Sequence, residues 1–193
     1  IEIATDLAFT SIVDASTGLA TPSYSTGALS GNITYYWRVR YDTPCGTSAW
    51  SSVFSLTTNG CSSYSSVDTP IAISAAGTPT ITSIINIPAG GTINDVNLTN
   101  VNGTHAWIKN LTFTLTSPLG TIVPLFSQIC NNQDNFDVGF DDASALTALP
   151  CPPTDGQVYQ PTGTLATFNG EDAAGNWVLT IVDGNNNNGG ELL

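Results

Sequence analysis

The sequence predicts an all-β protein built as a β-sandwich or jelly roll, and three observations support this prediction. Thr, Val and Ile dominate in short runs that Gly, Pro, Asn and Asp separate, which is typical of strands joined by turns. No long segment repeats apolar residues at helical spacing. Hydrophobic residues make up 41% of the 193 residues, enough to bury a core, whereas only 9% are charged.

The first predicted unit covers residues 1–58. Ile1-Glu2-Ile3 begins it as a strand, and residues 34–41 form its clearest strand, with Tyr35 and Trp37 on one face and Arg38 and Arg40 on the other. Residues 42–47 contain Pro44 and Gly46 and predict a hairpin loop, after which residues 49–57 return as the next strand. The polar residues 59–66 predict a linker.

The second predicted unit covers residues 67–193. Strands are predicted at residues 71–74, 81–87, 93–101, 111–117 and 121–126, and Pro118-Leu119-Gly120 predicts a tight turn between the last two. Residues 130–161 are rich in Asp, Asn, Pro and Gly and predict loops. A further strand is predicted at residues 177–182, followed by a turn at Asp183-Gly184 and four Asn residues.

Three segments of the first unit, residues 1–6, 36–40 and 45–51, resemble the later strands of a fibronectin type III module. Such modules have about seven strands in about 100 residues. The resemblance therefore implies a partial fibronectin type III-like β-sandwich that lacks the first two strands and exposes sheet edges.

Five segments of the second unit resemble, in order, the P domain of proprotein convertases, a β-jelly roll that follows the catalytic domain. They are residues 105–111, 114–121, 139–142, 168–172 and 175–181. Two departures stand out. The family usually carries Gly-Asp-Leu where this chain has Lys109-Asn110-Leu111, and we expect the chain to stop at residues 190–193 before the usual closing strand. The pairing of the two modules resembles secreted multidomain proteases of Bacteroidetes-like bacteria.

The charge balance restricts the partners. Three Lys and Arg residues against 15 Asp and Glu residues give a formal net charge of −12, which argues against nucleic acid and anionic membranes and favours cations. No apolar run reaches the roughly 18 residues of a membrane helix. No signal peptide begins the chain and Met is absent, so we expect a segment of a longer protein that is secreted or on the cell surface.

An acidic cluster in the loops of the second unit predicts a calcium site. Eight of the fifteen acids fall between residues 134 and 183, with no basic residue nearby in sequence. Loop carboxylates interspersed with Asn, Gly and backbone carbonyls suit Ca²⁺, which takes six to eight oxygen ligands. The alternative is a set of separate acids that cap turns. The candidate ligands are Asp141 and Asp142 first, then Asp137, Asp172 and Asp183.

Four cysteines without a Cys-x-x-Cys pair favour disulfides in an oxidising compartment. Cys130 and Cys151 flank the acidic loop and are expected to pair, closing about 20 residues and stabilising the fold by about 3 kcal/mol. Cys45 and Cys61 would then pair with each other, pair with cysteines outside this segment or stay reduced. Three connectivities remain open from the sequence alone.

Catalytic signals are weak. His105 is the single histidine, and neither a Gly-x-Ser-x-Gly nor a His-Glu-x-x-His motif is present. Together with these weak signals, the resemblance to the P domain implies a non-catalytic, calcium-binding accessory domain of a secreted protease, whose partner is the catalytic domain that it stabilises or positions. The alternative is a calcium-dependent adhesion or carbohydrate-binding module that uses exposed aromatics such as Trp107 on cell-surface or polysaccharide ligands. A hydrolase that uses two of the clustered acids is a weaker third hypothesis.

Overall fold

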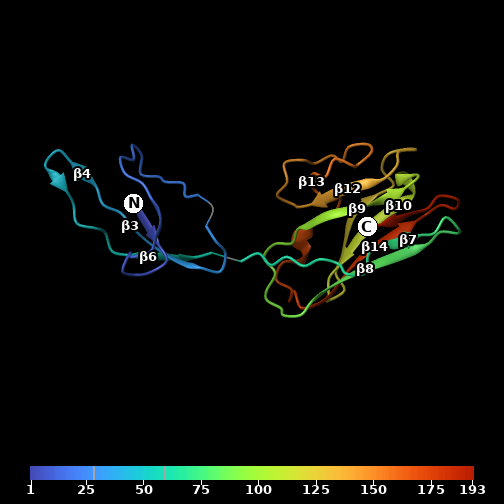
Figure 1. Ribbon diagram of the computed structural model, residues 1–193, viewed down its shortest axis with the longest axis horizontal. Helices are drawn as coiled ribbons and strands as arrows, with labels where there is room; N and C mark the ends of the chain where they lie inside the picture. Colours follow the sequence, from blue (N-terminus) through green and yellow to red (C-terminus); the bar gives the residue numbers. More distant parts are fainter. Residues whose placement is uncertain (28, 59) are drawn as a thin grey trace. The chain divides into compact units, whose positions relative to one another are not determined.

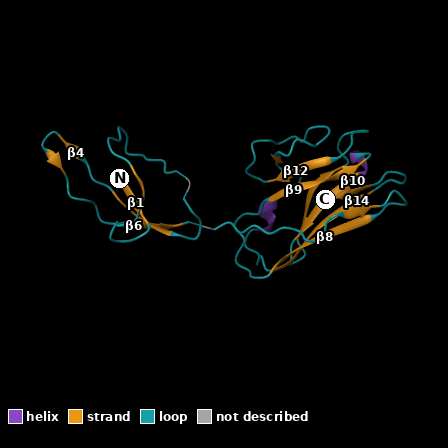
Figure 2. Cartoon of the chain, in the orientation of Figure 1, coloured by secondary structure: helices purple, strands orange, loops and turns teal. Residues whose placement is uncertain are grey.

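The structure, a computed structural model, describes residues 1–27, 29–58 and 60–193. Strands and loops make up almost all of it, with two short 3-10 helices in the described part of the chain (Figure 2). The all-β prediction is confirmed. The chain divides into two compact units, unit 1 at Ile1–Ser63 and unit 2 at Tyr64–Leu193. Within the described residues, no helix has the length and apolar character that a membrane span needs.

Unit 1 is built on a four-stranded antiparallel sheet in the order β2-β1-β3-β6, with a separate two-stranded hairpin, β4-β5. The strands are β1 Glu2–Ala4, β2 Ile12–Ala15, β3 Thr34–Arg38, β4 Asp42–Thr43, β5 Gly46–Thr47 and β6 Phe54–Thr57.

The strand predicted at residues 34–41 ends earlier, at Arg38, because beyond it the backbone N–H groups donate to serine hydroxyls and only the carbonyls keep backbone partners. Val39 N–H donates to Ser51 Oγ at 3.1 Å, and Tyr41 N–H donates to Ser48 Oγ at 3.1 Å.

A stack of cationic and aromatic side chains covers one part of unit 1. The guanidinium of Arg38 lies 4.0 Å from the ring centroid of Phe9 and 4.4 Å from that of Trp50, and Arg40 lies 4.3 Å from Trp50. Arg38 also forms an ion pair with Glu2 at 2.7 Å. Both arginines therefore stack on Trp50, and these contacts join β3 and the residues after it to the segment that precedes β6.

Unit 2 is a sandwich of two sheets (Figure 1). The four-stranded sheet has the order β11-β10-β14-β8, and the five-stranded sheet has the order β13-β12-β9-β15-β7. Pairing is antiparallel except between β12 and β13. The strands are β7 Ile71–Ile73, β8 Thr80–Ile87, β9 Leu98–His105, β10 Leu111–Thr116, β11 Ile122–Ser127, β12 Phe136–Phe140, β13 Val158–Tyr159, β14 Gly175–Asp183 and β15 Gly190–Leu192.

Alternating apolar residues of both sheets form one continuous core between them. Phe113 of β10 stacks on Phe126 of β11, with centroids 4.3 Å apart, and meets the edge of Phe136 of β12 at 5.0 Å. Trp177 of β14 is 6% exposed and packs against Phe168, as expected for a core residue. The 3-10 helices, η1 Ile108–Asn110 and η2 Leu165–Phe168, each contribute apolar side chains to this core.

Two predictions in unit 2 are wrong in part. The strand predicted at residues 93–101 is β9, at Leu98–His105, because Ile93 instead bonds through its backbone to Gly170 and Glu171 in a neighbouring loop. The loop-rich segment 130–161 contains β12, whose Phe136, Val138 and Phe140 all face the core. At residues 190–193, where no strand is predicted, Gly190–Leu192 form β15, between β9 and β7.

Candidate functional site

Asp141 and Asp142, the first two calcium candidates, follow β12, and their carboxylates accept hydrogen bonds from backbone N–H groups of two different segments. Asp142 accepts hydrogen bonds from Leu165 N–H at 3.0 Å and Ala166 N–H at 2.7 Å, which fixes the start of η2. Asp141 accepts from Ala143 N–H at 2.7 Å and so closes a turn within its own loop.

Asp172 and Asp137 lie in other parts of the fold. Asp172 accepts from Gly91 N–H at 3.2 Å and Ala174 N–H at 3.0 Å, so it ties the loop after β8 to the segment before β14. Asp137 of β12 is partly exposed, and its backbone oxygen accepts from Gly156 N–H at 2.9 Å.

Asp155 follows in the same loop as Gly156 and accepts from the Tyr159 hydroxyl at 2.6 Å. That hydrogen bond lowers the pKa of Asp155, against an opposing effect of burial, and raises the pKa of Tyr159.

Asp183, the fifth candidate, is buried and paired. Its Oδ2 lies 3.1 Å from Nε2 of His105, and both side chains have no exposed surface. Its Oδ1 accepts from Asn185 N–H at 3.0 Å. The other ring nitrogen of His105 accepts from Trp107 N–H at 3.2 Å. His105 is therefore a structural partner of Asp183 at the end of β9, in line with the non-catalytic role expected for it.

The structure does not bring the five candidate ligands to one point. Among the residues that it describes, no group of three or more His, Cys, Asp or Glu side chains gathers where it could hold a metal ion. Four of the five carboxylates instead accept backbone N–H groups of separate loops. As a set, these five residues do not fit a single calcium cage.

The structure contains the disulfide between Cys130 and Cys151, with Cα atoms 5.4 Å apart. It joins the segment after β11 to the loop between β12 and β13. Cys45 and Cys61 are exposed free thiols.

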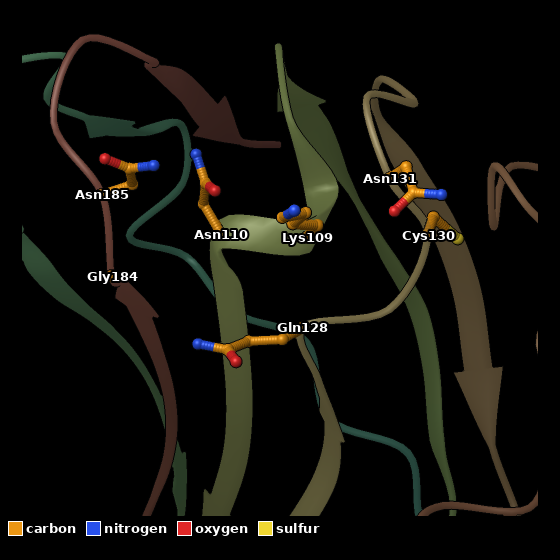
Figure 3. A pocket seen from close by; sticks show the side chains of 7 residues that line it. All are labelled: Lys109, Asn110, Gln128, Cys130, Asn131, Gly184 and Asn185. Atoms are coloured by element: carbon orange, nitrogen blue, oxygen red, sulfur yellow. The ribbon is translucent and has the colours of Figure 1, made fainter.

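A pocket of about 420 Å³ lies at one end of the unit 2 sandwich, where three segments far apart in the sequence meet. η1 contributes Lys109 and Asn110, the end of β11 and the following segment contribute Gln128, Cys130 and Asn131, and the turn after β14 contributes Gly184 and Asn185 (Figure 3). Backbone hydrogen bonds join these walls, from Gly184 to Asn110 at 2.8 Å and from Gln128 to Leu111 at 2.9 Å.

The lining of this pocket is polar, and the amide of Asn110 is its most unusual group. Asn110 is only 5% exposed, yet its Nδ2 finds no hydrogen-bond partner in the described part of the chain. Lys109 and Asn110 stand where the resembled family usually carries Gly-Asp, but the sequence predicts no pocket there. The sequence does show a single Lys in an otherwise acidic unit. It has no local pattern that would place Lys109 and Asn110 next to residues 128–131 and 184–185.

The fold and the site define a class of protein domain, a two-sheet β-sandwich with a polar pocket at one end. A sequence model of the proprotein convertase P-domain matches residues 93–193, and the chain belongs to that family. The comparison with curated proteins gives no match. The matched residues all lie in unit 2 and include η1, the buried pair and the pocket.

Membership of this family indicates the general role of the domain. The P domain is a non-catalytic accessory domain of proprotein convertase-like proteins, which are secreted or processed. Unit 1 precedes the matched residues, so the family assignment does not extend to it.

Proposed function

We propose that this chain is a non-catalytic accessory segment of a secreted protease, in which the P domain stabilises or positions the catalytic domain. The match of the P-domain family to residues 93–193 carries this proposal. The continuous core of unit 2 supports it, because a rigid sandwich presents a fixed surface to a neighbouring domain. Unit 1, with its fibronectin type III-like segments, would act as a spacer.

The test uses the secreted parent protein, purified with and without the substitution Phe126→Ala. Phe126 is 1% exposed, so its truncation removes core packing worth about 3–5 kcal/mol in unit 2. We expect proteolytic activity in the parent protein and a shorter half-life of that activity on heating in the variant. Leu119→Ala is the matched control, because Leu119 is 68% exposed in a turn. A parent protein without proteolytic activity, or equal half-lives, would contradict the proposal.

We also propose that calcium stabilises unit 2 through single carboxylates combined with backbone carbonyls, in place of one cage. The charge of this unit supports the idea, since residues 64–193 contain eleven Asp and Glu residues and a single Lys. Calcium should raise the melting temperature of the chain, whereas chelator or an equal concentration of magnesium should not. Asp137→Asn should reduce the shift and Asp95→Asn, an exposed control, should not. A melt that calcium leaves unchanged would end this proposal.

A second candidate function is an adhesion or carbohydrate-binding module. Trp107 favours it, because the residue is 41% exposed while its backbone N–H is hydrogen-bonded to the buried His105. A fixed, exposed aromatic ring offers a stacking face for a sugar. A polysaccharide pull-down with Trp107→Ala as the control tests this function, and retention that does not depend on Trp107 would count against it.

A further inference from the structure

Unit 1 exposes more large apolar side chains than it buries. Among its described residues four apolar side chains are buried, whereas the exposed large ones are Leu7, Ile12, Val13, Leu19, Val39, Tyr41, Val53, Phe54 and Leu56. The described part of unit 2 exposes the same number of large apolar side chains, but it buries 19 and is the longer unit. Single exposed apolar residues are ordinary on protein surfaces, but a contiguous group of them marks an interaction surface.

A contiguous group of this kind lies on β6. Phe54 and Leu56 are two residues apart in the strand, so their side chains lie on the same face of the sheet. The residues opposite them on β3 are Trp37 and Tyr35. The ring of Phe54 stacks on Trp37, with centroids 4.7 Å apart, yet Phe54 is 47% exposed and Leu56 is 40% exposed. The apolar side chains of β3 therefore continue onto β6, where they are open to solvent.

β6 is also an edge of its sheet, since the strand order is β2-β1-β3-β6. In an antiparallel sheet, alternate residues of an edge strand direct their backbone N–H and C=O groups away from the neighbouring strand. Proteins protect such edges with charges, prolines or bulges. The opposite edge strand, β2, carries Asp14 and pairs with β1 through a register shift. β6 consists of Phe-Ser-Leu-Thr and has no such protection, and the sequence contains no charged residue between positions 43 and 67.

The distribution of charge allows two copies of the chain to meet at this edge. Residues 1–63 contain four acids and two Arg, for a net charge of −2, whereas residues 64–193 contain eleven acids and one Lys, for a net charge of −10. Two copies therefore repel each other mainly through unit 2. At β6 they can approach without bringing charges of the same sign together, because the strand and the residues on both sides of it are uncharged.

The sequence of β6 is complementary to itself in an antiparallel pairing. With Ser55 of both copies on a two-fold axis, Phe54 of each copy lies opposite Leu56 of the other, and such apolar pairs stabilise neighbouring strands. The pairing joins two four-stranded sheets and uses the β6 edge of both copies. The edges that remain are the protected β2 strands, so the assembly closes at two copies.

We propose that unit 1 forms a two-fold dimer through β6, with a second copy of this chain as the partner. Stable interfaces bury about 800 Å² on each partner. An edge of four residues offers less than this, so the dimer is weak and dissociates on dilution. The proposal does not rest on the role in a protease, because it concerns unit 1 and not the P domain.

The test is sedimentation equilibrium of the 193-residue chain in which Cys45 and Cys61 are replaced by Ser, so that these exposed thiols cannot link two copies. We expect the average mass to rise from that of one chain toward that of two between about 5 µM and about 500 µM. Added salt should favour the dimer, because it screens the repulsion between the acidic units. The mass of one chain at every concentration would overturn the proposal and leave β6 to a strand of another protein, and assembly beyond two copies would overturn it as well.

Two lysine substitutions at exposed positions identify the edge that pairs. Ser55→Lys places two charges of the same sign opposite each other at the two-fold axis, so it should weaken association about tenfold. Ala15→Lys adds the same charge to the opposite edge strand, β2, and should leave association unchanged. Undiminished association of the Ser55→Lys variant, or an equal loss in both variants, would show that β6 is not the interface and would overturn the proposal.

Discussion

His105 and Asp183 are the two ionisable side chains that the sandwich removes from water completely, and their pairing can be tested directly. Asp183→Ala leaves His105 without its partner and removes the acceptor of Asn185 N–H. Breaking such a buried pair should lower the free energy of unfolding by about 3–5 kcal/mol in a denaturant titration. The double variant with His105→Ala should lose less than the sum of the single losses. Asp95→Ala is the exposed control, and a loss at Asp183 no larger than that of the control would contradict the pairing.

Asp155 and Tyr159 predict a pH dependence of stability. The Tyr159 hydroxyl lowers the pKa of Asp155, so the stabilisation is present above the ordinary Asp pKa of about 3.9 and is lost as the pH falls through the lowered value. Because the same hydrogen bond raises the pKa of Tyr159, this stabilisation is present below the ordinary Tyr pKa of about 10 and is lost as the pH rises through the raised value. Tyr159→Phe should therefore destabilise the chain at neutral pH and converge with the wild type at both extremes. Tyr41→Phe, at an exposed position, should track the wild type throughout, and a constant difference for Tyr159→Phe would disprove the linkage.

The acidic residues show how far single residues can be interpreted from the sequence. Their concentration between residues 134 and 183 is visible, and so is the alternative that they cap turns. Which of the two applies depends on where each carboxylate points. Asp142 reaches forward to η2 and Asp172 reaches back to Gly91, and both contacts join segments more than 20 residues apart. No local pattern encodes such contacts.

At the scale of elements, the disulfide is the strongest single restraint on the long β12–β13 region. Replacing Cys130 and Cys151 by Ser should lower the free energy of unfolding by about 3 kcal/mol, because the open loop gains conformational freedom in the unfolded chain. Replacing the free thiols Cys45 and Cys61 by Ser is the matched control and should change it by no more than about 0.5 kcal/mol. Equal effects of the two pairs of substitutions would refute the assignment.

Most strands of unit 2 could be predicted because alternation and turn residues are local signals. The β10–β11 hairpin is an example, since Gly120 has φ of +88° in the turn that Pro118-Leu119-Gly120 predicts. β12 carries an equally clear alternation of Phe136, Val138 and Phe140, but its surrounding Asp and Asn residues concealed it. β9 lies further along the chain than the strand predicted at residues 93–101, because Gly103 lies against Phe136 and the backbone of Glu191. That packing decides the register, and it depends on strands far away in sequence.

At the scale of the whole chain, the two compact units differ in the apolar core that each one buries. Among the described residues, unit 1 buries four apolar side chains, Ile3, Ala4, Phe9 and Tyr35, whereas unit 2 buries 19. Each large apolar side chain contributes about 1.5–3 kcal/mol when fully buried. We therefore expect two calorimetric transitions, with unit 1 unfolding at the lower temperature.

Two substitutions assign these transitions. Tyr35→Ala should lower only the first transition, because Tyr35 lies in the small core of unit 1, and Phe126→Ala should lower only the second. Limited proteolysis between the two transition temperatures should leave a fragment that begins near Tyr64, because unit 2 would still be folded there. A single transition that both substitutions shift equally would show that the two units unfold together. That result would contradict the prediction that unit 1, with its smaller core, unfolds first.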